Sequence, residues 1–270
     1  MLPTPDTSHV PFERVYEPAE DSYLLLDTLS ASSETSFLTS RFGSETSPSP
    51  PSPSPKSRPA VPLVVEIGTG SGVVIAFLAA HAATLFGTPT VLTAGIDLNG
   101  HACHATTSTV RRAVADNPST ASPSPLWLGA SLGDLTTPLR QGSVDVLVFN
   151  PPYVPSPELP TQSSATLVAS AGTKTTFDED SYLLSLSYAG GRDGMETTDR
   201  LIEALPEVLS PRGCAYILLC AQNKPDEVKG RIEGFGGGWR AVTVGESGKK
   251  AGWEKLQIIR VWRETEEHST

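Results

Sequence analysis

Between residues 61 and 263, short apolar runs alternate with segments of helical length, and this alternation restricts the fold more than any other feature. Leu63–Ile67 suits a strand buried on both faces, and Val73–Leu85 suits a helix packed on the resulting sheet. Such alternation predicts an α/β fold with a mostly parallel sheet covered by helices on both sides. Further strands are predicted at 91–96, 126–130, 144–149, 213–220, 239–244 and 256–262, and further helices at 19–29, 102–115, 180–186, 198–209 and 225–233. We expect the last two strands to form an antiparallel hairpin.

The chain divides by composition into four parts. Residues 1–30 form an N-terminal segment with one short helix, and residues 61–263 form the α/β domain. Between them, residues 31–60 are rich in Ser, Pro and Thr, and such a segment buries too little apolar surface to offset its ordering entropy. We therefore predict a disordered insertion there, and a short tail at 264–270.

Charge and cysteine content narrow the function classes. A net charge of -10 repels a phosphate backbone, which disfavours direct binding to nucleic acid. The three cysteines show no metal-ligand spacing and do not resemble a disulfide framework. No apolar stretch reaches the length of a membrane span, and residues 1–10 lack the features of a signal peptide. We expect a protein of the cytoplasm, and also of the nucleus, without a metal or a membrane partner.

A glycine-rich turn follows the first predicted strand. Gly68, Thr69, Gly70 and Gly72 lie directly after Glu66 and Ile67, and glycines let backbone amides approach a ligand closely where a helix begins. The third glycine falls one place earlier than in the G-x-G-x-x-G turn of NAD enzymes. The turn alone is only moderately specific, but it predicts a nucleotide-like ligand.

Carboxylates stand at the ends of neighbouring strands, where ligands of parallel sheets bind. Asp97 follows the second strand and could accept both hydroxyls of a ribose, while Asp134 could accept an adenine amino group beside Leu135. Glu66 could face a cationic end of the ligand. Each carboxylate could instead cap a helix or lie in a solvated turn.

Asn150, Pro151, Pro152 and Tyr153 come directly after the strand at 144–149. Two prolines restrict the backbone there and leave carbonyl groups without a local donor. The side-chain oxygen of Asn150 and the carbonyl of Pro151 could each accept one N–H of a planar NH2 group, with Tyr153 covering its face. The alternative is a turn that merely ends the strand.

These motifs together resemble the HemK-like family of class I methyltransferases, and most closely its eukaryotic branch, which methylates the glutamine of the Gly-Gly-Gln motif in translation release factors. Similar blocks occur in the family's order, at residues 15–22, 66–72, 149–153 and 189–194. The resemblance implies a Rossmann-like, seven-stranded sheet and S-adenosylmethionine as cofactor. It assigns the glutamine amide to residues 150–153, and the cofactor to Tyr16, Asp21, Ser22, Glu66, Gly68, Thr69, Gly70, Gly72, Asp97, Leu98, Asp134, Leu135 and Asn150.

The resemblance also implies a partner and leaves alternatives open. Its eukaryotic branch pairs with a small zinc-binding activator protein, which we expect at an edge strand formed by residues 126–130, although the chain's own loops could cover that edge. The alternative enzyme is an adenine-N6 methyltransferase acting on DNA or RNA, because the same clamp can hold an exocyclic amino group. A third alternative is a catalytically silent binding subunit, against which the intact motifs argue.

Overall fold

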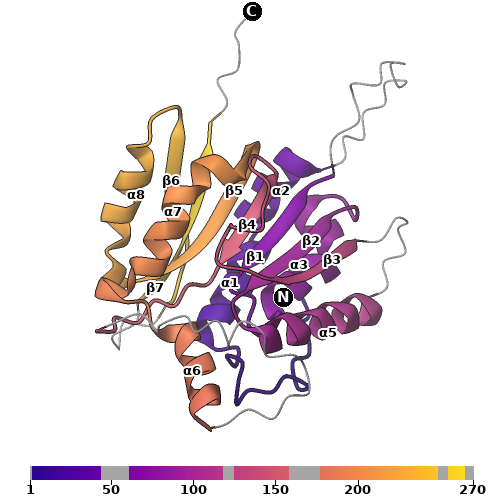
Figure 1. Cartoon of the computed structure of the whole chain (residues 1–270). Helices are drawn as coiled ribbons and strands as arrows, with labels where there is room; N and C mark the ends of the chain where they lie inside the picture. Colours follow the sequence, from indigo (N-terminus) through magenta and orange to yellow (C-terminus); the bar gives the residue numbers. More distant parts are fainter. Residues whose placement is uncertain (1, 44–60, 118–124, 158–176, 249–254, 265–270) are drawn as a thin grey trace, which may run out of the picture.

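The computed structural model describes residues 2–43, 61–117, 125–157, 177–248 and 255–264. A seven-stranded sheet in the order β3-β2-β1-β4-β5-β7-β6 forms its centre, with helices on both faces (Figure 1). Strands β1 to β5 are parallel, and β7 pairs antiparallel with both β5 and β6. The predicted fold class and the terminal hairpin are therefore confirmed. The strands are β1 Leu63–Ile67, β2 Leu92–Asp97, β3 Leu126–Leu132, β4 Val144–Phe149, β5 Leu209–Cys220, β6 Trp239–Glu246 and β7 Leu256–Arg263.

Strand periodicity divides the core between the two faces of the sheet. Val64 and Val146 pack with the helices on one face, whereas the adjacent Val65 and Leu147 pack with α7 and α8 on the other, as the two-residue period of a strand requires. Both faces are thus apolar at the centre. The helices are α1 Glu20–Ser30, α2 Ser32–Phe42, α3 Val73–Ala80, α4 Ala82–Phe86, α5 Gly100–Asp116, α6 Phe177–Tyr188, α7 Glu196–Val208 and α8 Pro225–Glu233, with 3-10 turns η2 Arg192–Gly194 and η3 Ala221–Asn223. Among the described helices, none combines the length and apolar character that crossing a membrane requires.

Helix α2 corrects the prediction that residues 31–60 are disordered. Ser32–Phe42 is helical, with Leu38 and Phe42 buried, while residues 44–60 lie outside the described part of the chain. Glu34, only 1% exposed, forms an ion pair of 2.7 Å with Arg260 of β7 and accepts a hydrogen bond from the Tyr216 hydroxyl. The partners of this helix are far away in the sequence, so its Ser-rich composition misled the local prediction.

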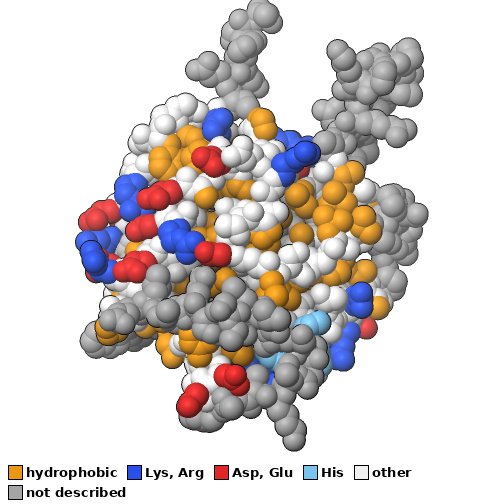
Figure 2. All heavy atoms as spheres, in the orientation of Figure 1, with side chains coloured by type: hydrophobic (Ala, Val, Ile, Leu, Met, Phe, Trp, Pro, Cys, Tyr) orange, Lys and Arg blue, Asp and Glu red, His pale blue; other side chains and the backbone are white. Residues whose placement is uncertain are grey.

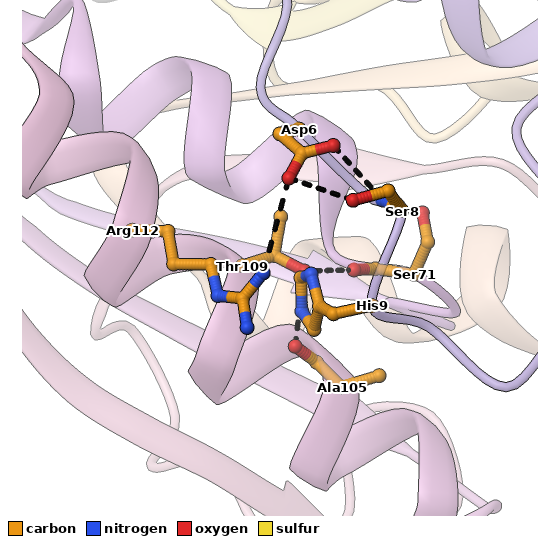
Figure 3. Close-up of polar contacts among 7 residues, drawn as sticks. All are labelled: Asp6, Ser8, His9, Ser71, Ala105, Thr109 and Arg112. Atoms are coloured by element: carbon orange, nitrogen blue, oxygen red, sulfur yellow. Dashed lines mark hydrogen bonds and ion pairs between the residues drawn. The ribbon is translucent and has the colours of Figure 1, made fainter.

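The N-terminal segment lies along α5 and reaches the glycine turn (Figure 3). The hydroxyl of Thr109 in α5 donates to the carbonyl of Ser71 at 2.7 Å and lies 3.3 Å from His9 Nε2. Asp6 of the same segment forms an exposed ion pair with Arg112, one helical turn further on. Contacts to α5 therefore hold the segment next to the loop that follows β1.

Candidate active site

One cavity opens at the carboxyl ends of β1, β2 and β4 and brings together most of the predicted cofactor residues. The N-terminal segment and α6 lie at this same end of the sheet (Figure 1). Ala189, from the block at 189–194, also lines the cavity, together with five residues whose local sequence did not point to a site: Arg14, Leu183, Leu186, Thr197 and Arg200. The predicted residues that line it are Tyr16, Asp21, Ser22, Glu66, Gly68, Thr69, Gly70, Asp97, Leu98, Asp134, Leu135, Asn150 and Pro152.

The glycine turn has the backbone conformation that its sequence requires. Gly68, Gly70 and Gly72 all have positive φ, at 64°, 51° and 78°. Gly68 and Gly70 line the cavity, whereas Gly72 does not, because it faces α5, where an added Cβ would lie 2.6 Å from the Cα of Thr106. The turn therefore forms part of the cavity wall through Gly68 and Gly70, whereas Gly72 packs against α5 and its contact with a ligand stays a prediction.

Asp97 lies at the end of β2 with both carboxylate oxygens oriented by backbone amides. Oδ2 accepts from Gly70 N–H at 2.9 Å, and Oδ1 accepts from Asn99 N–H at 2.8 Å. Burial raises the pKa of Asp97, and these hydrogen bonds oppose the rise. The Thr69 side chain and the Leu98 backbone also bond this carboxylate, which lines the cavity and can face the hydroxyl groups of a ligand there.

Asp134 carries one carboxylate oxygen that no described residue bonds. Its Oδ2 pairs with Arg200 at 2.5 Å, while its Oδ1 is buried and has no hydrogen-bond partner among the described residues. Leu135 beside it has φ +51° and is buried against the cavity. A buried acceptor without a donor is unfavourable, so an amino group supplied by a ligand would satisfy it. Arg200 orients this carboxylate from 66 residues away.

The N-terminal segment and α6 close the cavity from the side opposite the sheet. The hydroxyl of Tyr16 donates to Asp21 Oδ2 at 3.0 Å, and the backbone N–H of Ser22 donates to Oδ1 of the same carboxylate. Arg14 Nε donates to Asp180 Oδ1 in α6 at 2.9 Å, and both side chains of this ion pair are mostly buried. Two segments distant in the sequence are thus joined over the cavity.

Asn150 begins the loop after β4 and lines the cavity. Its Oδ1 is buried and has no hydrogen-bond partner among the described residues, which makes it a second unsatisfied acceptor. The backbone carbonyl of Asn150 lies over the glycine turn, 3.9 Å from the position of a Cβ on Gly68. Of the three residues that follow, only Pro152 lines the cavity, whereas Pro151 is buried and Tyr153 packs against the core on the α1 to α3 face.

Comparison with known proteins places the chain in a family. No model of a known protein family matches it. A mouse protein named methyltransferase HEMK2 is 33% identical over 266 residues, which cover 96% of this chain and 96% of that protein. The chain belongs to the HEMK2 methyltransferase family. The eukaryotic HemK-like branch inferred from the sequence is thereby confirmed.

Two further relatives are similar in sequence to this chain along nearly its whole length. The human protein named methyltransferase HEMK2 is 32% identical and covers 95% of both chains. A Schizosaccharomyces pombe protein named eRF1 methyltransferase catalytic subunit mtq2 is 30% identical and covers 97% of this chain and 96% of its own. Among solved structures, an rRNA methylase from Streptococcus thermophilus is 12% identical with a TM-score of 0.41, covering 86% of this chain and 94% of that one.

In this HEMK2-family chain, a second glycine-rich turn supports the loop that begins at Asn150. A Cβ on Gly190 would collide with the carbonyl of Pro152, and one on Gly194 would collide with the carbonyl of Tyr153. Val154 N–H donates to Tyr188 O at 3.0 Å, and Gly190 N–H donates to Val154 O at 2.8 Å. Residues 189–194 therefore pack against the back of the loop, and the absence of side chains at two positions permits the contact.

Glu66 combines a place in the cavity wall with a structural contact. It is buried, and its Oε2 accepts a hydrogen bond from Ile75 N–H at 2.9 Å, in the first turn of α3. Burial raises the pKa of Glu66 well above its ordinary value, and the nearby Asp97 adds to the rise. The carboxyl group thus caps α3 in the HEMK2-family chain, in addition to any contact with a ligand.

Replacing Glu66 with glutamine is expected to stabilise the ligand-free protein at high pH and to leave it unchanged at low pH. A raised folded-state pKa means that the wild type loses stability as the pH rises through it, by at most about 1.4 kcal/mol for each pH unit. Glutamine keeps an acceptor for Ile75 N–H and has no charge to bury. Urea unfolding between about pH 5 and pH 9 measures the difference. The exposed Glu203→Gln serves as control, and a pH-independent difference for Glu66→Gln would contradict the expectation.

Proposed function

We propose that the chain transfers a methyl group from S-adenosylmethionine to the side-chain amide nitrogen (N5) of the glutamine in the Gly-Gly-Gln motif of a eukaryotic translation release factor. The observation that carries this proposal is Asn150 Oδ1, a buried acceptor in the wall of the ligand cavity that has no hydrogen-bond partner within the described ranges of the chain. The relatives named HEMK2 and eRF1 methyltransferase catalytic subunit support it, because they match 96% and 97% of this chain and not only the sheet.

The residues of the cavity fit S-adenosylmethionine. Asp97 would accept the two ribose hydroxyls, and the unsatisfied Oδ1 of Asp134 would accept the adenine amino group, with Leu135 against the ring. Glu66 would face the cationic methionine end, and Tyr16 would cover the site together with Asp21, Ser22 and Leu98. When bound, S-adenosylmethionine would supply an electrophilic methyl carbon on a sulfonium centre.

Asn150 and Pro151 would orient the amide nitrogen that receives this carbon. The Asn150 side-chain oxygen would accept one N–H and the Pro151 carbonyl the other. Accepting both hydrogens holds the NH2 group in place and turns the lone pair of the nitrogen out of conjugation with its carbonyl. Such positioning can lower a barrier by roughly 7–11 kcal/mol in favourable systems, so the loop acts mainly through geometry.

The clamp requires no strong base. Positive charge that develops on the nitrogen acidifies the two N–H groups, and the acceptors that hold them stabilise that charge. One proton would pass to solvent water after the new N–C bond has formed and the bond between the methyl carbon and the sulfonium sulfur has broken. Burial raises the pKa of Glu66 and of Asp97. Because the clamp requires no strong base, we assign neither carboxyl group to proton removal.

A labelled-cofactor assay tests the proposed function. Tritiated S-adenosylmethionine is offered with the enzyme to intact release factor, to release factor whose Gly-Gly-Gln glutamine is replaced by alanine, and to nucleic acid. We expect label only in the intact release factor. Label in nucleic acid alone would support adenine-N6 methylation instead, and label in both release factors would move the target to another residue.

We further propose that a small zinc-binding activator protein pairs with β3. This strand is at one edge of the sheet, with its outer backbone groups facing away from β2. Leu126, Leu128 and Leu132 are 55%, 54% and 46% exposed, and hydrophobic side chains gather on the side of the molecule where β3 lies (Figure 2). An exposed apolar edge strand invites an added strand from a partner, which supports this location.

Leu128→Lys is expected to weaken binding of the activator at least tenfold, because it places a charge in the apolar part of the proposed interface. Val242→Lys is the matched control, since Val242 is a 38% exposed residue of β6, the opposite edge strand. Co-purification and titration calorimetry with the activator measure both variants. Equal binding by the two variants would rule out the β3 edge as the docking site.

A further inference from the structure

The two prolines after Asn150 do not fix the whole loop. A proline restricts its own φ and disfavours helical ψ in the residue before it. These restrictions cover Asn150 and Pro151, but they leave ψ of Pro152 and both dihedrals of Tyr153 undetermined. The second half of the loop must therefore be held by contacts from outside it.

Asn223 supplies a contact of this kind. It is the last residue of η3, immediately after β5, and is only 3% exposed. Its Nδ2 lies 3.4 Å from Tyr153 O, 3.0 Å from Asp193 O and 3.4 Å from Gly194 O. One side-chain amide thus connects the end of β5, the loop that begins at Asn150 and the turn at residues 189–194.

The other end of the same amide is also fixed. Asn223 Oδ1 accepts the backbone N–H of Cys220 at 2.8 Å, which orients the side chain from β5. An oxygen facing an N–H and a nitrogen facing three carbonyls define the orientation of the amide by chemistry alone. Asn223 does not line the cofactor cavity, so it touches neither the proposed cofactor nor the reacting atoms.

We infer that Asn223 is a positioning residue for methyl transfer, which rests on the function proposed above. It holds the Tyr153 carbonyl in place. By fixing this point of the loop, it orients the Pro151 carbonyl and the Asn150 side chain, which lie two and three residues earlier. Strand β4 fixes the start of the loop at Asn150, and Asn223 fixes its position at Tyr153. Removing the N–H donors releases the loop but leaves the cofactor site intact.

Asn223→Asp tests this inference because it replaces the donor NH2 group by an oxygen and keeps the shape of the side chain. The carboxylate still accepts Cys220 N–H, but when ionised it repels the three carbonyls. We expect kcat to fall about tenfold or more at about pH 8, while the Kd of S-adenosylhomocysteine stays within about threefold. A protonated carboxyl group can donate one O–H, and burial favours that form. The activity of Asn223→Asp relative to the wild type should therefore recover as the pH falls.

Asn223→Ala and Asn117→Asp complete the test. Alanine cannot donate at any pH, so its activity relative to the wild type should be low and independent of pH. Asn117 is the C-cap residue of α5, where it bonds Ala113 O, and Asn117→Asp should leave kcat unchanged. Wild-type kcat in both Asn223 variants, or a loss of cofactor affinity as large as the loss of kcat, would overturn the inference.

Hydrogen exchange provides a readout that needs neither cofactor nor substrate. The N–H groups of Val154 and Gly190 bond the facing segments, so both Asn223 variants should exchange them faster, while Asn117→Asp should not. Unchanged exchange in the Asn223 variants would overturn the inference. If the wild type fails to methylate release factor, the proposed function fails, and the exchange experiment still decides whether Asn223 holds the loop.

Discussion

Replacing Asn150 with alanine is expected to lower kcat for methyl transfer by about 10²–10³-fold, the effect of losing one aligned polar group that acts in the transition state. The side-chain oxygen would otherwise accept one N–H of the glutamine amide, and alanine leaves that hydrogen without a partner. The Kd of S-adenosylmethionine should stay within about tenfold, or 1.4 kcal/mol. Single-turnover methylation and titration calorimetry measure the two quantities separately.

The Asn150 prediction has a sharp alternative. Asn150 also lines the cofactor cavity, so its amide could contact the cofactor instead of the substrate. If calorimetry shows lost cofactor affinity and the rate is normal once the cofactor is saturating, Asn150 binds the cofactor and not the substrate amide. Asn117→Ala is the control, because Asn117 caps α5 away from the cavity.

Asp97→Ala should have the opposite pattern, with Kd of the cofactor raised on the order of 100-fold. Hydrogen bonds to an ionised carboxylate contribute about 1.5–3 kcal/mol each, and Asp97 would receive two from the ribose. The substitution also leaves the backbone N–H groups of Gly70 and Asn99 without their partner. Asp97→Asn is the matched variant, because it keeps the shape and one acceptor oxygen.

Calorimetry and thermal unfolding with added cofactor test the Asp97 prediction. A ligand that binds the folded state raises its stability in proportion to the logarithm of concentration over Kd, so the variant should show a smaller increase in Tm. We expect Asp97→Asn to lie between the wild type and Asp97→Ala. Unchanged affinity in Asp97→Ala would remove the residue from the ribose site.

The sheet was predictable because its strands have short-range signals. The predicted strand at 144–149 and the predicted helix at 225–233 coincide with β4 and α8, and both are bounded by proline. The predicted helix Val73–Leu85 divides at His81, whose φ of -109° and ψ of 20° end α3 before α4 begins. His81 Nε2 lies 2.8 Å from the carbonyl of Pro3, a contact from the N-terminal segment that local sequence cannot indicate.

The candidate site was predictable only where a motif marks it. The glycine turn and Asn150 directly follow strands, and Asp97 is the last residue of β2, so the parallel topology alone brings them together. Arg200 and Asn223 belong to the same end of the sheet, but they act on residues that are 66 and 70 positions away. Single polar residues in a helix or after a strand have no local signal, and only the folded arrangement reveals their partners.

The ion pair between Arg14 and Asp180 makes the wall of the pocket depend on a segment that contributes no strand to the sheet. A chain cut before β1 would keep all seven strands. It would lose Tyr16, Asp21 and Ser22 from the wall of the pocket, together with the anchor that α6 receives from residue 14. A fragment that retains the complete sheet but begins at β1 would therefore lack one wall of the cavity in which the reaction is proposed to occur.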